Sequence, residues 1–150
     1  MRTGLVYDDG YLQHDTGSYT ESAARLAAAY NHLKETGITD RLVLIRPRRA
    51  AVSEVALVHQ VRYIEKVRDF STRGGGNFGG GNTGSRETFD TSLLAVGGVF
   101  SAIDAVMAGC VDNAFVLARP PGHHAKAGGS GDLDNVQAIA CGRFHGLALK

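Results

Sequence analysis

The sequence has little cysteine, little net charge and no apolar segment at its start. Its 2 cysteines, Cys110 and Cys141, form no Cys-x-x-Cys pair, so a reducing cytosol is a simpler interpretation than a disulfide, which nothing supports. A formal net charge of +1 gives no electrostatic reason to expect a nucleic acid or a membrane surface as partner. Residues 1–4 lack the apolar core of a signal peptide, and no run reaches the length of a membrane span. We therefore expect a soluble, cytoplasmic protein.

The sequence also lacks internal repeats and any change of composition that would mark a second domain. Its 150 residues, 43% hydrophobic and 21% charged, predict a single domain over residues 1–150. Apolar runs and helical spacing predict strands at residues 3–7, 42–45 (buried) and 114–118, and helices at residues 22–36 (capped by Thr20 or Ser22), 54–58, 60–70, 89–108 and 133–148. This alternation predicts an α/β fold in three layers, with a mostly parallel sheet and helices on both faces.

Two glycine-bearing stretches need separate explanations. Residues 73–87 are rich in glycine, but no Lys-Ser or Lys-Thr step follows and no strand immediately precedes them, so they do not match a phosphate-binding loop. We expect a long functional or mobile loop there. Gly97 and Gly98 lie in the middle of the predicted helix 89–108, where glycine lowers helix propensity. Close approach of another backbone is the expected compensation.

The chain is organised around the run Arg119-Pro120-Pro121-Gly122-His123-His124-Ala125, which follows the predicted strand 114–118. The prolines fix φ and donate no hydrogen bond, so the strand delivers a stiff loop to the end of the sheet, where α/β proteins place their sites. Two imidazoles in one pocket would suit proton transfer near neutral pH. Taken alone, the dipeptide favours the alternative that both histidines only bond nearby carbonyls.

The same run resembles the signature of the histone deacetylase and acetylpolyamine amidohydrolase family. Further matching segments extend the resemblance over nearly the whole chain. They are Gly4 to Asp8 with His14 to Gly17, Leu57 to His59 with Tyr63-Ile64, Ala95 to Val99, and Asn113 to Phe115. The resemblance implies a truncated arginase/deacetylase-like fold. It also implies amide hydrolysis, in which zinc and a histidine activate the water that attacks an acetyl-amide carbonyl.

The resemblance assigns roles to individual residues. His123 and His124 would be the catalytic acid–base pair. Four further residues would contact the substrate or line its channel: Arg25, near an internal cavity; Gly122; Tyr19, which begins Tyr19-Thr20-Glu21 where the family has His-Pro-Glu; and Asn82, which replaces a substrate-holding aspartate.

The sequence departs from the family after the histidines. The phenylalanine that walls the acyl channel is missing from residues 131–136, and the sequence reaches Lys150 before the family's Asp-x-His and later Asp metal ligands. The spacing of His145, Asp132 and Asp134 in the sequence does not match a pattern of metal ligands. We therefore expect no bound metal and no cofactor, and a shortened relative that acts as a binding or interaction module.

Part of an α/β domain would leave a sheet edge and apolar helix faces uncovered, which predicts a homo-oligomer, most simply a dimer. One alternative is an active deacetylase whose metal site is completed by a dimer mate or partner chain, acting on an acetylated small molecule or peptide. The weakest alternative is a small-molecule or nucleotide binder that uses residues 73–87.

Overall fold

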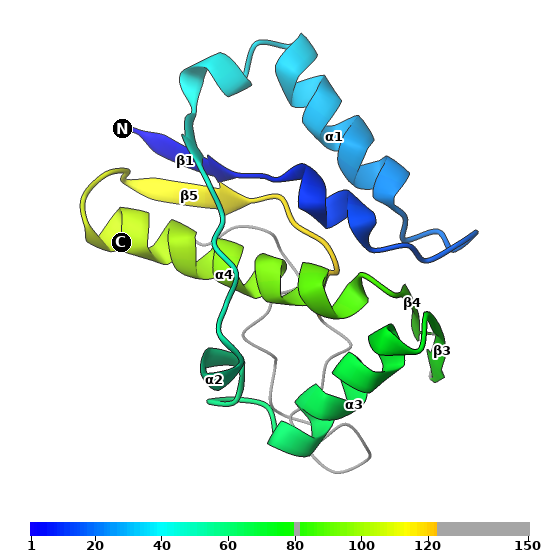
Figure 1. The fold of residues 1–150 in the computed structure, drawn as a ribbon. Helices are drawn as coiled ribbons and strands as arrows, with labels where there is room; N and C mark the ends of the chain where they lie inside the picture. Colours follow the sequence, from blue (N-terminus) through cyan, green and yellow to red (C-terminus); the bar gives the residue numbers. More distant parts are fainter. Residues whose placement is uncertain (80–81, 123–150) are drawn as a thin grey trace.

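The computed structural model describes residues 1–79 and 82–122, in which a parallel three-stranded sheet lies between two helices (Figure 1). The strand order is β2-β1-β5, and Thr3 of β1 pairs with Asn113 of β5 while Gly4 pairs with Val43 of β2. These strands are β1 (Thr3–Val6), β2 (Val43–Ile45) and β5 (Asn113–Val116), and the two helices are α1 (Ala23–Glu35) and α4 (Thr88–Met107). The predicted α/β architecture is confirmed. The predicted helix 133–148 lies outside the described residues, so the single domain stays a prediction.

The core lies between α4 and the sheet. Small side chains on α4, Ala95 and Ala102, allow the helix to approach the strands closely, and Tyr11 of the 3-10 helix η1 (Asp9–Gln13) is fully buried beside them. The rest of this cluster is Val6, Leu26, Ala114, Val116 and Ala118. By length and composition α4 could span a membrane, but here it packs on β1 and β5.

Residues 42–45 include the predicted strand, but the prediction that this strand is buried is wrong. Strand β2 stands at the edge of the sheet, with Leu44 61% and Val43 41% exposed. Leu44 is level with Leu5 of β1, which is only 1% exposed. An apolar run specifies a strand but not its place in the sheet, so the sequence could not separate the edge strand from the central one.

Residues 73–87 are not a loop without secondary structure. They form an antiparallel hairpin of β3 (Gly75–Gly79) and β4 (Asn82–Ser85), entered through three glycines with positive φ at residues 74–76. Phe78 packs edge-on against Phe70 of helix α3 (Val61–Thr72), with ring centroids 4.9 Å apart. Glycine has low strand propensity, which concealed the hairpin in the sequence. Phe78 also packs edge-on against Tyr63 of α3, with ring centroids 6.4 Å apart, and the Ser85 amide donates to Thr88 Oγ1 at 2.7 Å, so contacts with α3 and with the start of α4 attach the hairpin to the domain.

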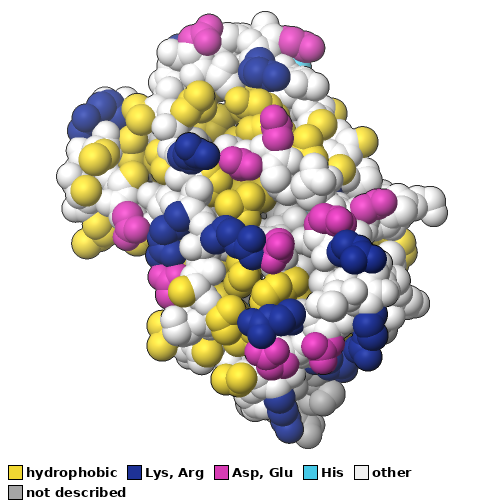
Figure 2. Space-filling model, in the orientation of Figure 1, with side chains coloured by type: hydrophobic (Ala, Val, Ile, Leu, Met, Phe, Trp, Pro, Cys, Tyr) yellow, Lys and Arg dark blue, Asp and Glu magenta, His cyan; other side chains and the backbone are white. Residues whose placement is uncertain are grey.

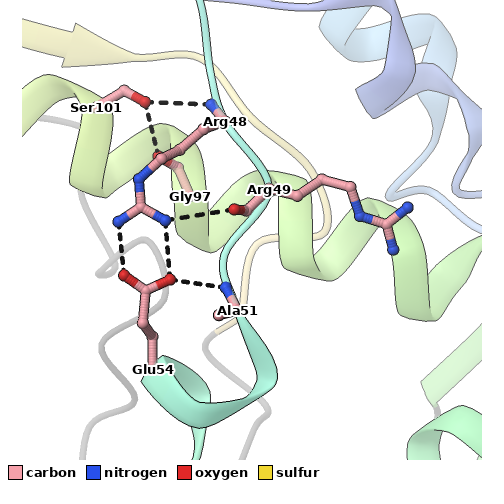
Figure 3. A network of polar contacts seen from close by, with 6 residues as sticks. All are labelled: Arg48, Arg49, Ala51, Glu54, Gly97 and Ser101. Atoms are coloured by element: carbon pink, nitrogen blue, oxygen red, sulfur yellow. Dashed lines mark hydrogen bonds and ion pairs between the residues drawn. The ribbon is translucent and has the colours of Figure 1, made fainter.

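The segment between β2 and helix α2 (Val52–Val55), residues 46–51, crosses α4 and is called the crossing segment (Figure 1). Figure 3 shows its attachment: Arg48 forms a bidentate ion pair with Glu54 at 2.6 and 2.8 Å, and its amide donates to Ser101 Oγ at 3.2 Å. Hydrogen bonds from Arg48 and from the Ala51 amide lower the pKa of Glu54 to about 2. A side chain at Gly97 would collide with the Arg48 carbonyl, which confirms the expected close approach of another backbone.

The other predicted elements agree with the structure to within a few residues. Gly37 has φ +67 just beyond the end of α1, as a left-handed glycine should. Helix α2 begins two residues earlier than predicted, because Glu54 accepts from the Ala51 amide and so caps the turn from inside. A short 3-10 turn, η2 (Thr39–Arg41), leads into β2.

Candidate functional site

Three segments converge at the carboxyl ends of β1 and β5, where sites of open α/β sheets lie. The first is the loop between η1 and α1, the second is the chain after β5, and the third is the start of α4. Leu117 donates to the Val6 carbonyl at 2.9 Å, which continues the β1–β5 pairing toward the loop. His14 Nδ1 lies 2.9 Å from Thr88 Oγ1, which joins the first segment to α4.

The centre of this region is Arg119, a charged residue that is only 4% exposed. Its Nε and Nη2 donate to the two carboxylate oxygens of Glu21 at 2.5 and 2.8 Å, and its Nη1 donates to the His14 carbonyl at 2.9 Å. The hydroxyl of Thr16 donates to the Glu21 carbonyl. We call Arg119, Glu21 and His14 the arginine anchor. Bidentate charge-assisted hydrogen bonds of this kind fix the relative orientation of the two side chains strongly. The anchor therefore ties Arg119, at the start of the loop that leads to His123, to the segment before α1.

The anchor shifts the titration of two of its members. Burial works to raise the pKa of the Glu21 carboxyl, but the hydrogen bonds and charge of Arg119, helped by His14 and Arg25, hold that pKa below its usual range. Burial lowers the pKa of His14, and the charge of Arg119 lowers it further against the opposing carboxylates of Glu21 and Asp15. At neutral pH the anchor therefore contains an ionised carboxylate and a neutral imidazole.

The His14 shift predicts a pH dependence of stability. Its folded pKa is below the unfolded value of about 6.5, so the unfolded chain binds the proton more readily and stability falls as pH drops below about 6.5. Urea unfolding at several values between about pH 7.5 and pH 5.5 would measure this fall. His14→Asn keeps a polar atom near Thr88 but does not titrate, so its fall should be smaller. An equal fall in both proteins would contradict the assignment.

The structure brings some predicted site residues near the anchor. Arg25 is exposed on the first turn of α1, where its charge acts on Glu21, and Tyr19 is 54% exposed before that helix. Asn82 begins β4, and Ser85 at the end of the same strand donates to the Gln13 carbonyl at 3.3 Å, so the hairpin borders the site. The roles of these residues toward a substrate stay predictions.

The described chain ends at the root of the predicted catalytic loop. Gly122 has φ +74, and His123 and His124 lie outside the described residues, as do Asp132, Asp134 and His145. Within residues 1–79 and 82–122, no group of three or more His, Cys, Asp or Glu side chains could hold a metal ion. The described residues therefore do not form a zinc site, and no chemical step is assigned to a metal here.

Sequence reasoning did not find the arginine anchor. In the sequence, Arg119 is visible only as part of a motif, His14 only as part of a matching segment, and Glu21 only as the end of Tyr19-Thr20-Glu21. One signal was available: Arg119 directly follows an apolar strand, and a charge buried there needs a partner. The sequence could not say which partner, because Glu21 is 98 residues away.

Comparison with known proteins decides the family. The family model described as histone deacetylase domain matches residues 19–131. The chain belongs to this family. It is 36% identical to a probable deacetylase of Archaeoglobus fulgidus, over 84% of this chain and 36% of that protein. It is 37% identical to a histone deacetylase-like amidohydrolase of Pseudomonas aeruginosa, over 82% of this chain and 37% of that protein.

Two further comparisons agree. The human polyamine deacetylase HDAC10 is 34% identical over 98% of this chain and 24% of its own length. The crystal structure of the HDA15 HD domain superposes with a TM-score of 0.78 at 26% identity, covering 85% of this chain and 37% of that one. The deacetylase-like α/β fold is thereby confirmed, and the chain spans about a third of the length of the relatives, or less.

Family membership corrects one expectation. We expected no cofactor, but the deacetylases to which the chain is related are zinc-dependent hydrolases, so that expectation is wrong. It rested on where the sequence stops at Lys150. Because the chain spans only 24% to 37% of its relatives, the position of its last residue says nothing about the metal.

Proposed function

We propose that the protein hydrolyses the amide bond of an acetylated amine, in a small molecule or a peptide, with His123 and His124 as its acid–base pair. The observation that carries this proposal is the arginine anchor. Arg119 is buried and paired four residues before His123, at the carboxyl ends of β1 and β5. Proton transfer to a departing amine requires imidazoles held within hydrogen-bond reach, which a rigid loop root favours. Zinc is the cofactor of the family, and its ligands are not among the described residues.

A direct assay tests this proposal. The zinc-supplied protein is expected to deacetylate a fluorogenic acetyl-lysine substrate or an acetylated polyamine. Turnover should disappear with a chelator and fall at least about a hundredfold in His124→Ala. The matched control is His32→Ala, because His32 is an exposed histidine on α1. Absence of turnover on both substrates from correctly folded, zinc-supplied protein would reject the proposal.

A second proposal, favoured by exposed apolar side chains, is that the protein acts as a homo-oligomer, most simply a dimer, or as an interaction module. Leu57 is 84%, Val61 60% and Leu44 61% exposed. Such side chains on helix turns and an edge strand favour association. In a dimer, a mate could also complete a metal site. Light scattering that shows only monomer at high concentration would contradict this proposal.

We also propose that the protein acts in the cytoplasm without nucleic acid or membrane partners. On the face drawn in Figure 2, basic and acidic side chains are interspersed and apolar ones lie between them. A polyanion partner would favour a continuous basic surface. Retention of the protein on a DNA column at physiological salt, lost as the salt concentration rises, would contradict this proposal.

A further inference from the structure

We infer that the ion pair of Arg119 with Glu21 is a positioning element for the acid–base histidines: it sets the direction in which the chain leaves the sheet toward His123. This inference rests on the proposed hydrolase function and adds two residues to it. Neither residue is placed in contact with the substrate.

The Arg119 side chain is held from two sides. Its guanidinium donates to Glu21 through Nε and Nη2 and to the His14 carbonyl through Nη1, so rotation in its plane would break bonds to partners 98 and 105 residues away. A lysine at this position could not reproduce the fork, because an ammonium is a point charge without a planar pair of donors.

The hold on Arg119 extends along the backbone on both sides of that residue. On the strand side, Ala118 is 3% exposed and Leu117 is bonded to β1. On the loop side, Pro120 and Pro121 restrict φ, and Gly122, with a left-handed φ of +74, is the one permissive residue between them and His123. With the Arg119 side chain fixed and the next two residues restrained in φ, the direction of the backbone up to Gly122 is set from the anchor.

The rate of catalysis depends more strongly on the position of a catalytic group than the stability of the fold does. A displacement of roughly 1 Å in a catalytic group can cost about a hundredfold in rate. A buried ion pair, in contrast, can often be replaced by apolar side chains of similar volume with little loss of stability. A role limited to stability and a positioning role therefore predict different results for the same replacement.

The experiment uses two variants of the whole protein. Arg119→Lys keeps the charge and loses the fork. The double variant Glu21→Leu/Arg119→Met replaces the pair by apolar side chains. Steady-state kinetics with acetyl-lysine peptide, the thermal unfolding midpoint and the zinc content are measured for each. We expect Arg119→Lys to lower kcat about tenfold to a hundredfold with KM within about twofold. The double variant should unfold near the wild-type midpoint, bind zinc as before and still have the lowered kcat.

A matched control is available on the crossing segment. Arg48 also forms a bidentate fork, through Nη1 and Nη2 with Glu54, away from the carboxyl ends of the strands. Arg48→Lys should keep wild-type kcat. A loss of kcat in Arg48→Lys equal to that in Arg119→Lys would overturn the inference.

The other possible outcomes also decide whether the ion pair has a positioning role. A wild-type kcat in Arg119→Lys, or a double variant that regains kcat together with stability, overturns the positioning role and leaves the hydrolase proposal intact. A wild-type protein without turnover overturns both. If Arg119→Lys does not fold, the double variant decides alone by the same two measurements.

Discussion

Glu21→Leu alone is expected to lower the free energy of unfolding by about 2–4 kcal/mol. The change leaves Arg119, at 4% exposure, without the carboxylate that neutralises it, and an unpaired buried charge is among the most costly defects in a protein interior. The range is set below the full penalty for a buried pair because the Glu21 side chain is itself 30% exposed, so water can partly replace it.

Urea unfolding at neutral pH measures this loss. Glu35→Leu is the matched control, since Glu35 is exposed at the end of α1, and its effect should stay within about 0.5 kcal/mol. The double variant with Arg119→Met should recover most of the loss, because it removes the stranded charge. If Glu21→Leu is as stable as the control, Arg119 is not buried as described.

Gly97→Ala is expected to destabilise the protein by about 1–3 kcal/mol, although alanine is the better helix former by about 1 kcal/mol. The added methyl group would collide with the Arg48 carbonyl and would lie 2.7 Å from the Ala50 amide nitrogen. That amide donates to the Leu93 carbonyl at 2.9 Å, so moving the crossing segment aside breaks this bond as well. Both contacts are with backbone, which cannot rotate out of the way.

The measurement is the unfolding midpoint in urea. Asp104→Ala is the control, because Asp104 is exposed on the same helix and its replacement improves helix propensity without adding an atom against the crossing segment, although it also removes a charge that acts on Arg48. Gly97→Ala should be less stable than wild type while the control is equal or more stable. Stabilisation by Gly97→Ala would mean that the crossing segment does not pack on α4.

Sequence reasoning succeeded where a local pattern has one physical explanation. The glycine pair in an apolar helix predicted a close backbone, which Gly97 has in the crossing segment, whereas Gly98 makes room for the Tyr11 hydroxyl instead. The run into Arg119 predicted a strand that ends at a stiff loop. Both features depend on a few neighbouring residues. The parallel direction of the main strands followed from their alternation with helices, although their order in the sheet did not.

It failed where the outcome depends on distant partners. Leu44 and Leu5 both lie in short apolar runs, but Leu5 belongs to the central strand and Leu44 to an edge strand, and burial is a property of the assembled sheet. The hairpin is attached through Phe78 to α3, a tertiary contact that overrides the low strand propensity of its glycines. The pairing of Arg119 with Glu21 joins opposite ends of the described chain, and no local pattern encodes such a pair.

The register of the sheet has a consequence for how the site comes apart. Thr3 pairs with Asn113, so almost the whole described chain forms one closed loop between two neighbouring strands, and the arginine anchor closes the same loop a second time. Local opening of the hairpin or of α3 leaves both closures intact. Detachment of β1 releases both at once, because β1 carries one pairing and the segment that follows it carries the other. Because β1 is the central strand and pairs with both β2 and β5, loss of a few amino-terminal residues would remove every pairing of the three-stranded sheet and the strand that leads to Glu21.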